Sequence, residues 1–210
     1  FISAIEHPCV LKPAQALARR SCDQWTTHQL AVNPSGQVDL DAANAAMHVN
    51  KPGLVSVMLA NNETGVIQDV AGIAEMARSH GAYMHTDAIQ GLGKIPLDFA
   101  ALKVHAMTLS AHKIYGPKGA AALIVDKRLL LKPLIYGGGH ENGLRSGTEN
   151  VPAIVGFGVA CELAKSRMPE TAIHVSKLRD HLEKGLIAMG AVIFGAAAAR
   201  DRRSPDCQRA

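Results

Sequence analysis

Residues 53–87, GLVSVMLANNETGVIQDVAGIAEMARSHGAYMHTD, combine two apolar runs with a helical pattern between them. The first run, 53–59, is short, continuous and rich in Val and Leu, which is typical of a strand buried on both faces of a sheet. The helical pattern starts near Asp69 and stops at Gly81, residue types that favour the beginning and the end of a helix. This order predicts two parallel strands joined by a crossover helix.

The same alternation extends toward both ends of the chain. Continuous apolar strands between helices predict the α/β fold class, with a mostly parallel sheet sandwiched by helices. We expect further strands in residues 1–5, 28–32, 82–87, 105–110 and 119–125, and helices in residues 9–20, 39–47 and 98–103.

From residue 151 the pattern becomes helical. Residues 151–168 and 170–190 each predict a helix, and Pro169 is expected to break the chain between them. We therefore expect residues 1–167 to form a large domain and residues 168–195 to begin a smaller C-terminal α/β domain. Residues 196–210 lose their apolar periodicity, which predicts a disordered tail.

Composition limits the classes of function. The chain has 210 residues, of which 48% are apolar and 19% charged, so it can bury a core. The net charge of +4 is scattered, which gives no indication of a nucleic-acid partner. No apolar run is long enough for a membrane span, and no signal peptide is visible, so we expect a cytoplasmic protein. The four cysteines form no CxxC pair, and we predict no metal site; they are Cys9, Cys22, Cys161 and Cys207.

Polar side chains follow several predicted strands at the point where each strand ends. His7 follows the first strand, and Ser110, His112 and Lys113 follow the strand 105–110. Two further candidates are Asn62 and Asp87. Asp87 lies 25 residues after Asn62, and Lys113 lies 26 residues after Asp87, so each interval is about one strand-helix period. This spacing places Asn62, Asp87 and Lys113 at one edge of a parallel sheet, where ligands of α/β proteins bind.

Each of these residues also has an ordinary structural interpretation. Asn62 lies in NNETG, a good turn sequence, Asp87 could cap a turn, and a lysine is most often exposed to solvent. The ordinary interpretation does not explain why four strand ends carry polar groups in the same way. Taken together, the residues predict a binding or catalytic site.

A lysine, an aspartate, an imidazole and small hydroxyl or amide donors are the set that pyridoxal phosphate (PLP) chemistry uses. The amine of Lys113 would form a Schiff base with the aldehyde, and Ser110 and His112 would bind the phosphate. The segment YGPKG, residues 115–119, would then turn the chain away, with its glycines letting the backbone pass close to the ligand. A P-loop is excluded because no GxxxxGK[ST] is present, and residues 136–148 do not fit GxGxxG.

Four long motifs occur in order along the chain: ANNETGVIQDV (60–70), HTDAIQGLGKIPLDF (85–99), SAHKIYGPKGAAAL (110–123) and GGGHENGLRSGTENVPAIVGFG (137–158). Together they resemble the cysteine desulfurases and selenocysteine lyases, PLP enzymes of fold type I in the class V aminotransferase group. The resemblance runs from about residue 1 to about residue 195, and it implies the large domain of a PLP-dependent transferase.

The resemblance implies a role for each candidate residue. Lys113 is similar to the Schiff-base lysine, and His7 to an imidazole that stacks on the pyridine ring and moves protons with Lys113. Asp87 resembles the partner of the pyridine nitrogen, and Gln90 a donor to the phenolic oxygen. The further cofactor-binding residues that it implies are Asn62, Ser110, His112 and Thr148. Thr148 would reach the cofactor of a neighbouring subunit, which implies a homodimer.

The implied reaction removes sulfur from L-cysteine, or selenium from selenocysteine, and leaves alanine. A mobile cysteine of the family receives the sulfur as a persulfide and passes it to an acceptor protein, for iron–sulfur clusters or thio-cofactors. A selenocysteine lyase, another class V lyase or aminotransferase, or a non-catalytic remnant of the fold remain alternatives.

The sequence departs from the family pattern near both ends. We expect it to lack an upstream Gly-Ala-Thr-like turn that binds the phosphate. We also expect it to lack a downstream loop with the persulfide cysteine and an arginine for the substrate carboxylate. The Arg-rich segment after residue 195 suggests a frameshift or truncation, and Cys207 is not assigned the role of nucleophile. Full turnover by these residues alone is not expected.

Overall fold

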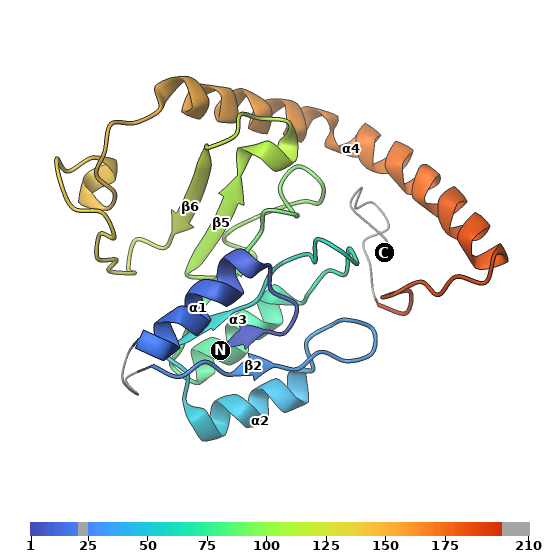
Figure 1. Cartoon of the computed structure of the whole chain (residues 1–210), viewed down its shortest axis with the longest axis horizontal. Helices are drawn as coiled ribbons and strands as arrows, with labels where there is room; N and C mark the ends of the chain where they lie inside the picture. The colour runs from blue at the N-terminus through green and yellow to red at the C-terminus, as the bar shows by residue number, and fades with distance from the viewer. Residues whose placement is uncertain (21–24, 199–210) are drawn as a thin grey trace.

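A computed structural model describes residues 1–20 and 25–198 of the chain (Figure 1). Two of the cysteines, Cys22 and Cys207, and most of the predicted tail lie outside the described residues. No helix within the described ranges is both long and apolar enough to span a membrane.

The strands form one sheet in the order β2-β1-β3-β4-β5-β6. Neighbouring strands are parallel except at the edge, where β6 runs antiparallel to β5. The predicted fold class, with its mostly parallel sheet, is therefore confirmed. The strands are β1 (Ile2–Ser3), β2 (Gln29–Leu30), β3 (Leu54–Ser56), β4 (Tyr83–Asp87), β5 (Ala106–Ser110) and β6 (Ala121–Val125).

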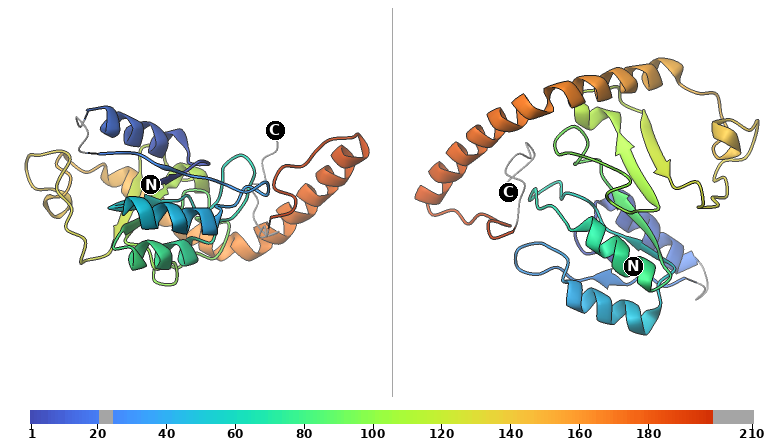
Figure 2. Two further views of the ribbon diagram at one scale, coloured as in Figure 1. Left: turned by 90° about the horizontal axis from the view of Figure 1, so that it is seen from below. Right: turned by 180° about the vertical axis from the view of Figure 1, so that it is seen from behind.

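Helices lie on both faces of the sheet: α1 covers one face, and α2 and α3 cover the other (Figure 2). Asp39 and Asp69 cap α2 and α3, each accepting a hydrogen bond from a backbone N–H of the first turn. The long helix α4 runs along the β5–β6 side of the sheet and contacts η1 (Figure 1). The α-helices are α1 (Pro8–Arg20), α2 (Leu40–Asn50), α3 (Val70–Ser79) and α4 (Val151–Ala188), and the short 3-10 helices are η1 (Ala111–Ile114) and η2 (Glu141–Gly143).

Two sequence-based expectations about helices are wrong. Residues 98–103 form a single turn: the Asp98 carboxylate accepts the N–H groups of Ala100 and Ala101, as at a helix start, but Lys103, with a φ of 56°, ends the turn before a helix forms. The expected break at Pro169 is absent, since α4 continues through it as one helix of 38 residues. Pro169 removes one backbone donor, but Lys165, whose carbonyl loses that partner, is exposed to water. The domain boundary at residue 168 stays a prediction.

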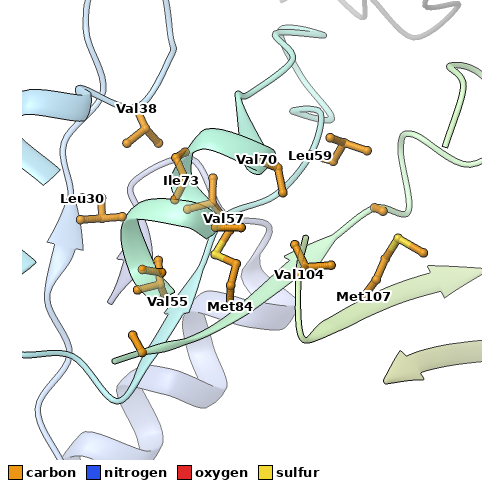
Figure 3. Packing of buried hydrophobic residues seen from close by; sticks show 14 of the residues in the cluster. Leu30, Val38, Val55, Val57, Leu59, Val70, Ile73, Met84, Val104 and Met107 are labelled. Atoms are coloured by element: carbon orange, nitrogen blue, oxygen red, sulfur yellow. The ribbon is translucent and has the colours of Figure 1, made fainter. Parts of the chain in front are cut away.

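The hydrophobic core lies between the sheet and the helices α2 and α3. Figure 3 shows Val55, Val57 and Met84 of the sheet region next to Val70 and Ile73 of α3. All five side chains are at most 1% exposed. This packing fixes the positions of β3 and β4, and with them the loops at their carboxyl ends.

The Asp69 cap makes a measurable contribution to this packing. Asp69→Ala is expected to lower the free energy of unfolding by about 1 kcal/mol, because the Gly72 N–H loses its acceptor at the start of α3. Urea denaturation measures this difference. Glu162→Ala, at an exposed site inside α4, is the control and should change stability by less than about 0.5 kcal/mol. Equal effects of the two substitutions would contradict the capping role.

The direction of the chain connections changes between β1 and β3. From β1 the chain passes through α1 to β2, whereas from β3 it passes through α3, on the opposite face, to β4. Neighbouring strands whose connections diverge in this way leave a crevice at their carboxyl ends, which is where open α/β sheets bind ligands.

Candidate active site

The sequence-predicted residues lie at the carboxyl ends of the parallel strands. His7 follows β1, Asp87 is the last residue of β4, and Ser110 is the last residue of β5. His112 and Lys113 lie directly after Ser110 in η1. Since β4 and β5 are paired neighbours, with Asp87 opposite Thr108, the Asp87 and Lys113 segments share one edge of the sheet.

The Asp87 carboxylate is buried and faces the beginning of α1. Its side chain is 4% exposed, and its Oδ1 accepts a hydrogen bond from the Ile89 N–H at 3.0 Å. Its Oδ2 lies 3.9 Å from the Cys9 thiol, so the end of β4 and the first turn of α1 meet here. The presence of Asp87 contributes to a raised pKa of the Cys9 thiol, after the larger effect of burial.

Glu6, which precedes His7, is a buried carboxyl group to which the sequence analysis gave no role. Its Oε1 accepts hydrogen bonds from the Ser3 hydroxyl and the Met58 N–H, both at 2.6 Å. Its Oε2 is buried and has no hydrogen-bond partner within the described residues. Burial raises the pKa of Glu6 to about 7, and the nearby Asp87 adds to this effect. Glu6 thus fastens the His7 segment to the end of β3.

The same contact explains why β3 ends earlier than predicted. The expected strand covered residues 53–59, but regular pairing on both sides stops at Ser56 because β1 ends at Ser3. Beyond Ser56, Val57 and Leu59 still donate to the carbonyls of β4 on one side. On the other side, the Glu6 carboxyl replaces the missing strand as the acceptor for Met58.

The imidazole of His7 is exposed, and its tautomer is set by the start of α1. The Cys9 N–H donates to Nδ1 of His7 at 3.2 Å. An Nδ1 atom that accepts a hydrogen bond carries no proton, so neutral His7 holds its proton on Nε2. The backbone therefore leaves His7 with one N–H group available to a ligand.

Asn62 and its neighbour Asn61 have different roles in the turn after β3. Asn61 organises the turn, because its Oδ1 accepts the N–H groups of Glu63 and Thr64, while its Nδ2 donates to the Ile5 carbonyl. Asn62 is half-buried, and its side chain makes no hydrogen bond within the described part of the chain. The amide of Asn62 is therefore available to a ligand, and its binding role stays a prediction.

The η1 segment presents a hydroxyl, an imidazole and an amine. Ser110 Oγ and His112 Nδ1 are 2.7 Å apart and share a hydrogen bond. Lys113 is exposed, and among the described residues its ammonium group has neither a hydrogen bond nor an ion pair. Tyr115 ends η1 with a φ of 64°, after which the chain turns at Gly116. This glycine was expected to approach a ligand; here it is needed because a Cβ would lie 2.9 Å from the Ala111 Cβ.

Two buried polar residues, Gln90 and Lys94, lie in the loop after β4. Lys94 Nζ donates to Gln90 Oε1. Burial, and to a lesser extent the positive charge of Lys113, lower the pKa of Lys94 to about 8. Gln90 was predicted from the resemblance, whereas Lys94 was missed, although both lie in the motif 85–99.

His85 connects three strands below this edge and was also missed. Its Nδ1 lies 2.8 Å from the Ser56 hydroxyl of β3, and its Nε2 lies 3.3 Å from the Thr108 hydroxyl of β5. Burial lowers the pKa of His85, which favours the neutral ring at physiological pH. The arrangement holds the ends of β3, β4 and β5 in register under the candidate site.

Thr148 is the predicted residue that the structure does not bring to the others. It is exposed and lies in the long loop between β6 and α4, which extends away from the sheet (Figure 1). Its side chain makes no hydrogen bond within the described ranges. The role implied for Thr148, at the cofactor of a neighbouring subunit, stays a prediction.

Relatives with established names match most of the chain. The chain is 43% identical over 185 residues to a cysteine desulfurase of Gluconacetobacter diazotrophicus, covering 88% of this chain and 46% of the relative. It is 44% identical over 202 residues to the cysteine desulfurase IscS of Colwellia psychrerythraea, covering 95% of this chain and 48% of the relative. The chain thus spans about half the length of the curated relatives it matches.

A solved structure shares the fold. The NifS-like protein of Rickettsia africae superposes with a TM-score of 0.85 at 38% identity, over 95% of this chain and 54% of that one. The family model described as aminotransferase class V matches residues 1–205. Because this match includes every strand end described above, the chain belongs to the aminotransferase class V family.

Proposed function

We propose that this chain supplies the lysine-bearing half of a PLP-dependent cysteine desulfurase, which removes sulfur from L-cysteine and leaves alanine. The observation that carries the proposal is the placement of the exposed Lys113 amine and the buried Asp87 carboxylate at the ends of neighbouring strands. The similarity to cysteine desulfurases over most of this chain favours this activity among those of the class V family.

The donor set of the site fits PLP. Asp87 is a buried carboxylate suited to a protonated pyridine nitrogen, because such a charge pair is strong where water is excluded. Ser110 and His112, which already share a hydrogen bond, offer a hydroxyl and an imidazole to a phosphate group. The exposed Lys113 Nζ is available to an aldehyde.

Each of these residues then has a chemical task. PLP, when bound, supplies an electron sink that stabilises negative charge at the Cα atom of an amino acid. Lys113 would hold PLP through Nζ, and the same atom would take up or give a proton when it is free. Asp87 would keep a proton on the pyridine nitrogen, and His7 offers the N–H of Nε2. Asn62 offers an amide, from the turn after β3, that makes no hydrogen bond to the described residues.

Further features of the proposal concern partners. We propose that the active protein is a cytoplasmic homodimer in which Thr148 serves the neighbouring subunit, and that a sulfur-acceptor protein receives the product sulfur. The position of Thr148 on an exposed loop, away from the sheet edge with Lys113, supports sharing of the site between subunits.

An absorbance titration with PLP tests the proposal. Wild-type chain is expected to develop a band at roughly 400–430 nm, where PLP joined to a lysine absorbs, and L-cysteine should change the band. Lys113→Ala should abolish it, whereas Lys118→Ala, at an exposed lysine after η1, should keep it. Folded wild-type chain without such a band, or a band that persists in Lys113→Ala, would contradict the proposal.

A further inference from the structure

The loop after β4 packs tightly against the segment that carries Lys113. A Cβ atom on Gly93 would lie 2.9 Å from Ile114 Cγ2 in η1 and 2.8 Å from Ala164 Cβ in α4. Gly93 also has a φ of +70°, which favours glycine. On the other side, a Cβ atom on Gly91 would lie 2.7 Å from Leu59 Cδ2. The two glycines therefore fix this loop between the end of β3 and η1.

Inside the loop, Lys94 determines how the Gln90 amide is oriented. The two residues are 8% and 5% exposed, and Lys94 Nζ donates to Gln90 Oε1. An ammonium group has only donors, whereas a side-chain amide has one acceptor oxygen and one donor nitrogen. The oxygen of Gln90 is therefore engaged by Lys94, and Nε2 remains for an acceptor. Among the described residues, Nε2 of Gln90 donates to no other group.

The surrounding charges indicate which kind of acceptor fits. Lys94 and Lys113 are both cations, and the charge of Lys113 lowers the pKa of Lys94. Two neighbouring cations repel each other, and an anionic ligand bound beside them relieves that repulsion. Since Lys94 is buried, its charge is screened less by water than that of an exposed lysine.

We propose that Lys94 is a positioning residue: it holds the Gln90 amide so that Nε2 donates to an anionic oxygen of a ligand bound at Lys113. The inference rests on the proposed function, in which that ligand is PLP. Lys94 acts through Gln90 and through its charge, and it does not itself react.

Nuclear magnetic resonance of the chain without PLP tests the positioning contact. The side-chain amide signals of Gln90 in ¹⁵N-labelled wild type are expected to shift with pH with a midpoint near the pKa of Lys94, about 8. Lys94→Met should abolish this transition, and Lys118→Met, at an exposed lysine, should leave it unchanged. Gln90 signals that do not respond to pH in the wild type would overturn the positioning role, without any variant being needed.

PLP binding tests the effect on the ligand. Lys94→Met is expected to weaken PLP affinity by about tenfold, the effect of losing one hydrogen bond of ordinary strength from Gln90 Nε2, and to shift the pH midpoint of the visible band. Lys94→Arg, which keeps the charge and the donors, should recover part of both. Unchanged affinity and midpoint in folded Lys94→Met would overturn the inference. If the Gln90 signals titrate but wild type binds no PLP, the proposed function fails and PLP is excluded as the ligand.

Discussion

Asp87→Asn is expected to weaken PLP binding roughly a hundredfold, the effect of losing a charge-assisted hydrogen bond of about 3 kcal/mol. Asparagine keeps an oxygen for the Ile89 N–H, which Asp87 binds at 3.0 Å, so the local turn should survive. It loses the negative charge that a protonated pyridine nitrogen requires. Titration of the visible band with PLP measures the change, and circular dichroism checks the fold.

Asp98→Asn is the matched control for this substitution. Asp98 also accepts a backbone N–H two residues ahead, that of Ala100, at 2.8 Å, but it is exposed. PLP affinity should therefore stay within about twofold of wild type, since exposed charges contribute little. An equal loss in both variants, or no loss in Asp87→Asn, would show that Asp87 is not the partner of the ring nitrogen.

The second large expected effect is a decrease in the free energy of unfolding with rising pH, caused by the burial of Glu6. The pKa of Glu6 is raised from its ordinary value of 4.5 to about 7 in the folded chain, mainly by burial. The folded state therefore binds the proton more tightly than the unfolded state, and Glu6 favours folding most at low pH. As the pH rises from 4.5 to about 7, this contribution falls by about 3 kcal/mol in total.

Comparison of wild type with Glu6→Gln isolates this contribution from other titrating groups. His85, whose pKa is lowered by burial, has the opposite pH dependence, but it is present in both chains. The free energy of unfolding of the variant, relative to wild type, should therefore increase across this range of pH. Urea denaturation at a series of pH values measures it. A difference between the two chains that is constant with pH would show that Glu6 is ionised normally in the folded state.

The sequence predicted those residues of the site that lie at strand ends, since strand ends repeat along the chain at the spacing of one strand-helix unit. Asp87 and Lys113 follow strands of one parallel sheet, so their spacing alone placed them at a common edge, and the observed pairing of β4 and β5 agrees. Glu6 and Lys94 were missed because a single ionisable residue in a sequence carries no indication of burial. The partner of Glu6, the Met58 N–H, comes from a distant part of the chain. The contact of Lys94 depends on the shape of its loop, which Gly91 and Gly93 determine.

The errors about helices have a related cause. At residues 98–103, the helical pattern covers only six residues, and Lys103, with a φ of 56°, ends it after a single turn. At Pro169, the helical residues on both sides outweighed one missing backbone hydrogen bond. Local signals therefore predicted the class and order of the elements better than their boundaries.

Reductive trapping followed by peptide mapping tests most directly whether Lys113 binds PLP. Borohydride joins PLP permanently to the amine that holds its aldehyde, so mass spectrometry can identify that amine. We predict a single modified peptide that contains Lys113, and no modification of the buried Lys94 or the exposed Lys118. A modification spread over several lysines, or one confined to a residue other than Lys113, would contradict the assignment of the site.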